Sequence, residues 1–186
     1  MLTVLPVDIQ IGLDDGSYWG GNRNNLHFEA NVARLLKATR QANRALIHIK
    51  HNSDNPESPL RPDQPGNDFK PESMPLEGET VIGKSVNSAF IGTDLESRLR
   101  KAGSNRLIIF GLTTQHCVST TVRMAGNLGF DTCLVGDATA AFPIIDADGN
   151  TIDAETVHRI HLASLDGEFA RVISTDEAVS LITATD

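Results

Sequence analysis

The segment "GLTTQHCV" (111–118) places a cysteine just after an apolar run that ends in glycine. The pattern of residues 115–129 predicts a helix, so Cys117 falls in its first turn. Backbone N–H groups there lack intrahelical partners, and the helix dipole favours a negative charge. Both effects favour a thiolate and lower a thiol pKa, and the same N–H groups can stabilise an oxyanion. By position alone, Cys117 is either a nucleophile or a small apolar residue packed beneath the helix.

Two other residues with useful chemistry follow predicted strands. Asp8 ends the segment "LTVLPVD", and Lys84 ends "TVIGK". A carboxylate beside a thiol can accept its proton, and a lysine can pair with the carboxylate and favour a thiolate. Taken singly, Asp8 has an ordinary interpretation as a turn residue and Lys84 as a solvated surface lysine. The functional hypothesis depends on three strand ends that bring these residue types together.

The elements that must position these residues alternate along the chain. Apolar patterns predict strands at 2–9, 44–51, 80–84, 105–111, 130–138 and 170–175, and helices at 27–43, 93–103, 115–129, 151–167 and 175–184. Thr93 and Glu96 have the spacing of a capping box for the second helix. Residues 51–79 are rich in Pro, Asp, Asn and Ser and predict a long, irregular, functional loop.

Continuous apolar strands that alternate with helices predict an α/β fold. We expect a three-layer, doubly wound, mostly parallel sheet with helices on both faces, of Rossmann-like type. Active sites of such sheets lie beyond the carboxyl ends of the strands. Asp8, His51, Lys84 and the 111–117 turn therefore should meet at one edge of the sheet.

Composition excludes several classes of function. The chain has 186 residues, 40% of them apolar, which predicts one globular domain over 1–186. A net charge of −8 argues against nucleic acid as a partner. The apolar runs fall short of the ~20 residues that span a bilayer, so no membrane partner is expected. Met1 runs directly into an apolar strand without a basic leader, which predicts a cytoplasmic location. A reducing compartment disfavours a disulfide between Cys117 and Cys133, and Cys133 is predicted to be a core residue.

Several motifs together resemble the isochorismatase-like cysteine hydrolases. They are "DIQ" with Asp8, "VIGKSVNSAFIGTDLESRLRKAG" with Lys84, and "RLIIFGLTTQHCVSTTVRMAGNLGFDTCLVGDA" with Cys117. The resemblance runs from the first strand to the last helix and includes "AETVHRIHLASLDGEFARVISTDEAV". Its most specific part lies between Lys84 and Asp137.

This resemblance implies an Asp–Lys–Cys triad, matched here by Asp8, Lys84 and Cys117. In the family the cysteine attacks a carbonyl carbon and forms a thioester, the aspartate shuttles protons, and the lysine supports the charge. The resemblance also implies a cis peptide at Leu112–Thr113 and an oxyanion hole of the backbone N–H groups of Thr113 and Cys117. It further implies a homo-oligomer, either a dimer or a tetramer.

The sequence departs from the family pattern at two places. Many members read "D-x-Q-x-x-F", but "DIQIGLDDGSYWGG" lacks the phenylalanine, and a Tyr18–Trp19 pair follows that can line the pocket. Nicotinamidases carry an Asp-x-His ligand pair after the second strand, where this chain reads "HIKHNSD". His48 and His51 lie three apart on a strand and point to opposite faces, so we expect no zinc centre and no cofactor. His48 is predicted to be buried.

The presence of Cys117 favours hydrolysis of amides or related C–N bonds, because the branch that cleaves only the isochorismate ether lacks this cysteine. Candidate substrates are small carbamoyl, maleamate-like, lactam and amide compounds. The predicted substrate contacts are Gln10, Trp19, His51, Phe90 and His116, with Asn87 and Gln115 as further polar candidates. His158 and His161 are predicted to be surface or interface residues, and Asp137 a structural cap.

Alternative functions remain open from the sequence. One is isochorismatase-type or nicotinamidase-type activity, and another is a catalytically idle binding protein on the same fold. A dithiol redox protein is disfavoured, because Cys117 and Cys133 lack a Cys-x-x-Cys spacing.

Overall fold

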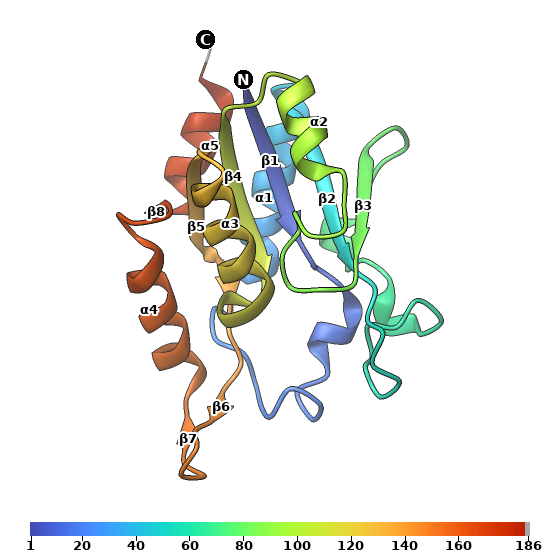
Figure 1. The fold of residues 1–186 in the computed structure, drawn as a ribbon, viewed down its shortest axis with the longest axis vertical. Coiled ribbons are helices and arrows are strands. Elements are labelled where there is room, and N and C mark those ends of the chain that lie inside the picture. Colours follow the sequence, from blue (N-terminus) through green and yellow to red (C-terminus); the bar gives the residue numbers. More distant parts are fainter. Residues whose placement is uncertain (185–186) are drawn as a thin grey trace.

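The computed structural model describes residues 1–184 and contains a central sheet of six parallel strands (Figure 1). The strands are β1 (Leu2–Val7), β2 (Ala45–His51), β3 (Thr80–Lys84), β4 (Arg106–Leu112), β5 (Asp131–Ala140) and β8 (Arg171–Ile173). Their order across the sheet is β3-β2-β1-β4-β5-β8, and every neighbouring pair is parallel. The strand order changes direction between β1 and β4, and ligands bind beside such a switch point in doubly wound sheets.

Helices cover both faces of the sheet, so the predicted fold class is confirmed (Figure 1). The helices α1 (Phe28–Gln41) and α5 (Thr175–Thr183) pack on one face. The helices α2 (Leu95–Lys101), α3 (Ser119–Asn127) and α4 (Ala154–Leu165) contribute side chains to the other face. Each predicted strand and helix is present, with shifts of a few residues at the ends.

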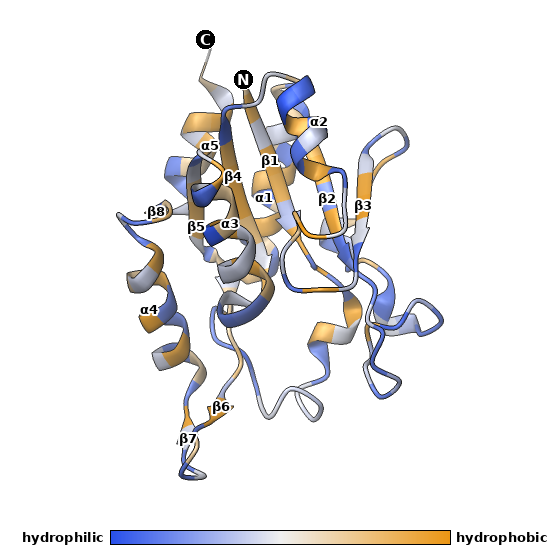
Figure 2. Ribbon diagram, viewed as in Figure 1, coloured by the Kyte–Doolittle hydropathy of each residue, from blue (hydrophilic) through white to orange (hydrophobic). Residues whose placement is uncertain are grey.

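Alternation along β1 and β4 explains why their sequences are apolar throughout. Val4 and Ile108 point into the core beneath α1 and α5. Leu5 and Ile109, one residue further along each strand, point into the core beneath α2 and α3. Figure 2 shows both strands as mostly hydrophobic ribbons. Because each fully buried side chain of this size contributes about 1.5–3 kcal/mol, the two cores fix these strands firmly.

The start of α2 differs from the prediction. The helix begins at Leu95, with Asp94 as the N-cap residue and no capping bond from the Asp94 side chain. The hydroxyl of Thr93 donates to the carbonyl of Ala89, 2.6 Å away, and accepts from the N–H of Leu95 at 3.3 Å rather than from that of Glu96. The predicted Thr93–Glu96 capping box is therefore wrong.

A small antiparallel hairpin precedes α4 and was not predicted. It consists of β6 (Ile144–Ile145) and β7 (Thr151–Ile152). Strands of two residues carry too short an alternation to be recognised in a sequence. The carboxylate of Asp146 orders the turn between them by accepting from the N–H groups of Asp148 and Asn150.

Two irregular segments, 12–25 and 52–79, lie beyond the carboxyl edge of the sheet and are held against α1 by charges. The ammonium of Lys70 is almost fully buried and binds the carboxylates of Asp14 and Glu29. Arg23 binds Glu29 as well. Short 3-10 turns η1 (Ile11–Asp14), η2 (Pro65–Asn67) and η3 (Pro71–Ser73) interrupt these segments. None of the helices within residues 1–184 is long and apolar enough to cross a membrane.

Candidate active site

Asp8 follows β1 directly and is buried at the switch point. Its backbone adopts a left-handed conformation with φ of 51°, which aspartate tolerates better than most residues. Its N–H donates to the carbonyl of Ile49 on β2, 3.0 Å away. Residues in sparsely populated backbone regions cluster at functional sites. The side chain is 1% exposed and points toward the ends of the neighbouring strands.

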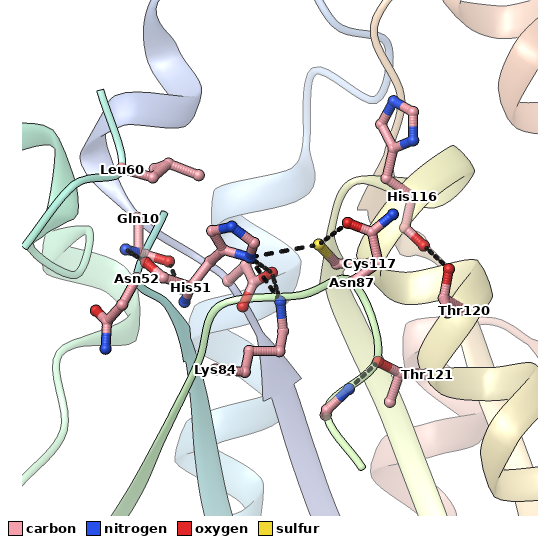
Figure 3. A network of polar contacts seen from close by, with 12 residues as sticks. Gln10, His51, Asn52, Leu60, Lys84, Asn87, His116, Cys117, Thr120 and Thr121 are labelled. Atoms are coloured by element: carbon pink, nitrogen blue, oxygen red, sulfur yellow. Dashed lines mark hydrogen bonds and ion pairs between the residues drawn. The ribbon is translucent and has the colours of Figure 1, made fainter. Parts of the chain in front are cut away.

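Lys84 and His51 end two adjacent strands and are register partners. The Nζ atom of Lys84 lies 2.6 Å from Oδ2 of Asp8 and 2.9 Å from Nδ1 of His51 (Figure 3). An ammonium group only donates, so Nδ1 of His51 must accept, and the ring proton belongs on Nε2. One cation thus fixes the orientation of both a carboxylate and an imidazole.

Cys117 comes from the opposite side of the switch point. Its Sγ atom lies 3.9 Å from Nδ1 of His51 and 3.8 Å from Oδ1 of Asn87 (Figure 3). A carboxylate oxygen of Asp8, a ring nitrogen of His51 and Sγ of Cys117 all lie within 4.8 Å of one another. The structure therefore brings Asp8, His51, Lys84 and Cys117 together at one edge of the sheet, where the sequence predicted that they would meet.

A glycine, Gly111, precedes the turn that carries Cys117, and any other residue there would force the backbones of β1 and β4 apart. Gly111 has φ of +133°, and a Cβ atom there would lie 2.0 Å from the carbonyl oxygen of Val7. This close approach of β4 to β1 brings the following turn beside Asp8. The Leu112–Thr113 peptide bond is cis, as the resemblance implied.

Cys117 lies in a π-helical turn, η4 (Thr114–Val118), rather than in the first turn of α3. Burial and the charge of Asp8 raise the pKa of its thiol, and the opposing effect of Lys84 is smaller. This direction is opposite to the lowered pKa that the sequence predicted, because burial and the charge of Asp8 outweigh the charge of Lys84. A raised pKa favours the neutral thiol, which needs a base before it can attack.

A base is available in the same cluster. Oδ1 of Asp8 is buried and, among the residues described, has no hydrogen-bond partner, while Oδ2 is bound to Lys84. Buried polar atoms are nearly always hydrogen-bonded, so each orphaned one calls for an explanation. An unpartnered carboxylate oxygen beside a neutral thiol is suited to accept its proton.

A cavity of about 160 Å³ opens in front of Cys117. Its apolar wall is formed by Leu13, Tyr18, Trp19, Leu60 and Leu112. The indole N–H of Trp19 donates to the carbonyl of Gly12 at 2.8 Å, and its ring stacks on Phe142 at 5.8 Å. Trp19 is thus held rigidly at the cavity, where the sequence placed it, and Tyr18 packs edge-on against it.

The polar wall comes mainly from the long loop and from the turn itself. It is formed by Ser53, Asn55, Ser58, Asn87, Thr113 and His116, and His51 also lines the cavity. Burial and the neighbouring His161 lower the pKa of His116. Sequence analysis missed Ser53, Asn55, Ser58 and Leu60, because an irregular loop has no periodicity that tells which residues face inward.

Gln10 does not reach the cavity, contrary to the prediction of a substrate contact. It is fully buried, its amide nitrogen donates to the carbonyls of His51 and Asn67, and its amide oxygen accepts from the N–H of His51. These contacts make it a positioning residue for His51. Because it lies two residues after Asp8, Gln10 is next to the end of β2, where its amide can bind the backbone of His51.

Phe90 was also predicted at the substrate pocket but lies elsewhere. Its ring stacks on Phe130, with centroids 6.0 Å apart, and packs against the core beneath α2 and α3. The N–H of Ala89 donates to the hydroxyl of Thr121 at 3.1 Å, which ties this segment to α3 (Figure 3). Phe90 therefore supports the loop that carries Asn87 and does not line the cavity.

Two further histidines, His48 and His158, are buried and make structural contacts. His48 is fully buried, as predicted, with Nε2 2.9 Å from a carboxylate oxygen of Glu79. His158 is buried rather than at the surface, so that prediction is wrong. Its Nδ1 atom lies 2.7 Å from the hydroxyl of Thr114 and supports the turn of Cys117 from behind.

Asp137 acts as the predicted cap. Its Oδ1 atom accepts from both the N–H and the hydroxyl of Thr175, at 2.8 Å each, where α5 begins.

The donor atoms of Asp8, His51 and Cys117 are close enough to hold a metal ion. The ammonium of Lys84, however, already binds two of these three residues. A metal ion would have to displace a buried cation from its partners. The donor set therefore fits a protein cation better than a metal.

This chain is similar in sequence and in fold to known proteins. The isochorismatase domain model matches residues 4–177. The isochorismatase family protein YrdC of Bacillus subtilis is 45% identical over 177 residues, which cover 95% of this chain and 94% of YrdC. An isochorismatase-family protein from Chromobacterium violaceum, solved by crystallography, is 46% identical with a TM-score of 0.92, over 97% of this chain and 92% of that one. The ureidoacrylate amidohydrolase RutB of Variovorax paradoxus is 28% identical over 138 residues, 59% of this chain and 55% of RutB.

Proposed function

This chain belongs to the isochorismatase family of hydrolases, and we propose that it cleaves a C–N bond of a small molecule through a thioester on Cys117. The observation that carries the proposal is the orphaned Oδ1 atom of buried Asp8, whose carboxylate lies in the same cluster as Sγ of Cys117. The similarity to an amidohydrolase supports the choice of a C–N bond.

The first half of the reaction forms the thioester. Oδ1 of Asp8 accepts the thiol proton of Cys117 as the sulfur attacks the substrate carbonyl carbon. The carbonyl oxygen becomes an oxyanion, which the backbone N–H groups of Thr113 and Cys117 stabilise. Asp8 then donates its proton to the nitrogen, the C–N bond breaks, and ammonia or an amine leaves.

The second half releases the acid. Asp8, again a carboxylate, removes a proton from water, whose oxygen attacks the thioester carbon. The C–S bond breaks, the proton returns to the sulfur, and a carboxylic acid leaves. The net change is one amide and one water converted to one acid and one amine.

Lys84 has an indirect role in this proposal. By holding Oδ2 of Asp8 at 2.6 Å, it leaves Oδ1 free to accept a proton. Its charge also stabilises the thiolate during attack, because it opposes the rise in the pKa of Cys117. A homo-oligomer remains a prediction from the family resemblance.

The test is ammonia or amine release from a panel of small primary amides, carbamoyl compounds and lactams. We expect release by the wild-type protein and none by Cys117→Ala. The matched control is Cys133→Ala, because Cys133 is the other free cysteine and lies in the core. Equal release by Cys117→Ala would exclude the covalent mechanism, and no release by any variant would support an idle binding protein.

A further inference from the structure

Among the described residues 1–184, none that lines the cavity in front of Cys117 carries a charged side chain. Its lining residues include no lysine, arginine, aspartate or glutamate. The ammonium of Lys84 lies beside the lining residue His51, but its side chain is 0% exposed and bound to Asp8 and His51. A substrate in the cavity therefore meets no unpaired cation from the sheet.

The loops that form the cavity offer no spare cation either. Segments 12–25 and 52–79 contain three basic residues, Arg23, Arg61 and Lys70. Arg23 and Lys70 bind Glu29, and Arg61 binds Asp63 at 2.6 Å. Each positive charge of these loops is thus already matched by a carboxylate of the protein.

The two histidines of the cavity do not replace a cation. Burial and the charge of Lys84 lower the pKa of His51, and burial lowers that of His116. His51 also accepts from Lys84, which leaves its Nε2–H as a neutral donor. In Figure 3 its second ring nitrogen points away from Lys84. The nearby charge of Asp54, which acts on His51, adds to the negative field.

We propose that the substrate is a small uncharged amide, and that the cavity discriminates against compounds that carry a carboxylate. This inference rests on the proposed function and names the substrate class. A carboxylate in this cavity would lose water and gain no cationic partner, which is costly. The charge of Asp54, which acts on His51 at the cavity wall, would also repel it. The preference for a neutral amide therefore comes from the missing partner for a carboxylate as much as from favourable contacts with the amide.

The other walls suit a neutral molecule. Trp19 and Leu60 offer apolar contact, and the side chains of Ser53, Asn55 and Ser58 offer hydroxyl and amide groups. Pockets for drug-sized ligands measure roughly 300–1,000 Å³. At about 160 Å³, this cavity fits a compound much smaller than that.

The experiment compares succinamide with succinamate, which share a carbon skeleton and an amide but differ in charge. We expect kcat/KM for succinamide to exceed that for succinamate by about 30-fold or more, because the carboxylate loses water and gains no cationic partner. Asn55→Arg places a cation at the cavity wall and should raise kcat/KM for succinamate selectively. Ser97→Arg adds the same charge at an exposed position of α2 and should leave the ratio of the two kcat/KM values unchanged.

The outcomes separate the inference about substrate charge from the proposed C–N hydrolase function. Turnover of succinamate equal to or faster than that of succinamide would overturn the inference and leave the C–N hydrolase proposal standing. If the enzyme cleaves neither, protection of Cys117 from iodoacetamide replaces turnover, and better protection by succinamate overturns the inference. The proposed function fails separately, if no amide of the broader panel releases ammonia or amine.

Discussion

Nζ of Lys84 lies 2.6 Å from Oδ2 of Asp8, and the two side chains are 0% and 1% exposed. The other carboxylate oxygen of Asp8 is buried without a partner. The carboxylate is thus divided into one oxygen that is anchored and one that is free for proton transfer. This division depends on strand order, because β1, β2 and β3 are consecutive neighbours in the sheet.

Lys84→Met should abolish turnover and destabilise the protein by about 3–5 kcal/mol, because it leaves the charge of Asp8 buried and unpaired. Urea unfolding measures the change. The double variant Asp8→Asn/Lys84→Met removes both charges and should recover much of the stability without activity. A single variant as stable as the wild type would contradict the buried ion pair.

Alkylation of Cys117 by iodoacetamide should be slow at neutral pH and accelerate into the alkaline range. Burial and the charge of Asp8 raise the pKa of this thiol, so the thiolate is scarce near pH 7. Rates measured by mass spectrometry in a Cys133→Ala background give the titration. Asp8→Asn should move the inflection to lower pH, since it removes a repelling charge. If the alkylation rate of the protein with Asp8 intact has its inflection below pH 7, Cys117 is instead a preformed thiolate.

Glu79 should make stability pH-dependent in acid. Hydrogen bonds from Arg40, from the N–H of Leu76 and from His48 lower the pKa of Glu79 from 4.5 to about 2. Since the folded-state pKa lies below the unfolded one, this stabilisation is complete above pH 4.5 and is lost as pH falls toward 2. Glu79→Gln should flatten the decline in the free energy of unfolding over that range. An unchanged slope in this variant would assign the acid sensitivity to other groups.

Gly111→Ala should destabilise the fold by about 3 kcal/mol or more and impair activity, because the added Cβ meets the backbone of Val7. Gly78→Ala is the matched control. Gly78 also has a positive φ, of +86°, but a Cβ there meets nothing within 4 Å. The control should cost about 1 kcal/mol, from backbone conformation alone. Equal costs for the two variants, measured by thermal unfolding, would show that the β1–β4 contact is not decisive.

Removal of metal ions should leave turnover unchanged. The ammonium of Lys84 binds Asp8 and His51, which are two of the three residues grouped as possible metal ligands. Activity is compared before and after dialysis against EDTA and after addition of Zn²⁺. Loss of activity with recovery on adding Zn²⁺ would support a nicotinamidase-type centre instead.

The fold and the triad positions were accessible from sequence because each rests on short-range patterns. The apolar strand 105–111 and the Gly-Leu-Thr-Thr turn place Cys117 at a strand end, and the same holds for Asp8 and Lys84. The carboxyl ends of parallel strands share one edge, so their convergence follows from topology. The cis peptide at Leu112–Thr113 was expected only because of the family resemblance, and no pattern of residues by itself predicted it.

The details that the sequence left undetermined depend on packing. The pKa of Cys117 is set by burial, which a motif does not encode. Gln10 and Phe90 were predicted at the substrate because they accompany the triad in sequence, but one binds the backbone of His51 and the other stacks on Phe130. The residues of the 52–79 loop could not be placed, because an irregular loop has no period.

Acid-quenched mass spectrometry tests the central claim most directly. The protein is mixed with an amide that it hydrolyses, quenched during turnover and digested. We predict that the peptide containing Cys117 gains the mass of the acyl group, that hydroxylamine removes it, and that Cys117→Ala shows neither the adduct nor turnover. Turnover that persists in Cys117→Ala, with no acyl mass on Cys117 in the wild type, would contradict the covalent mechanism.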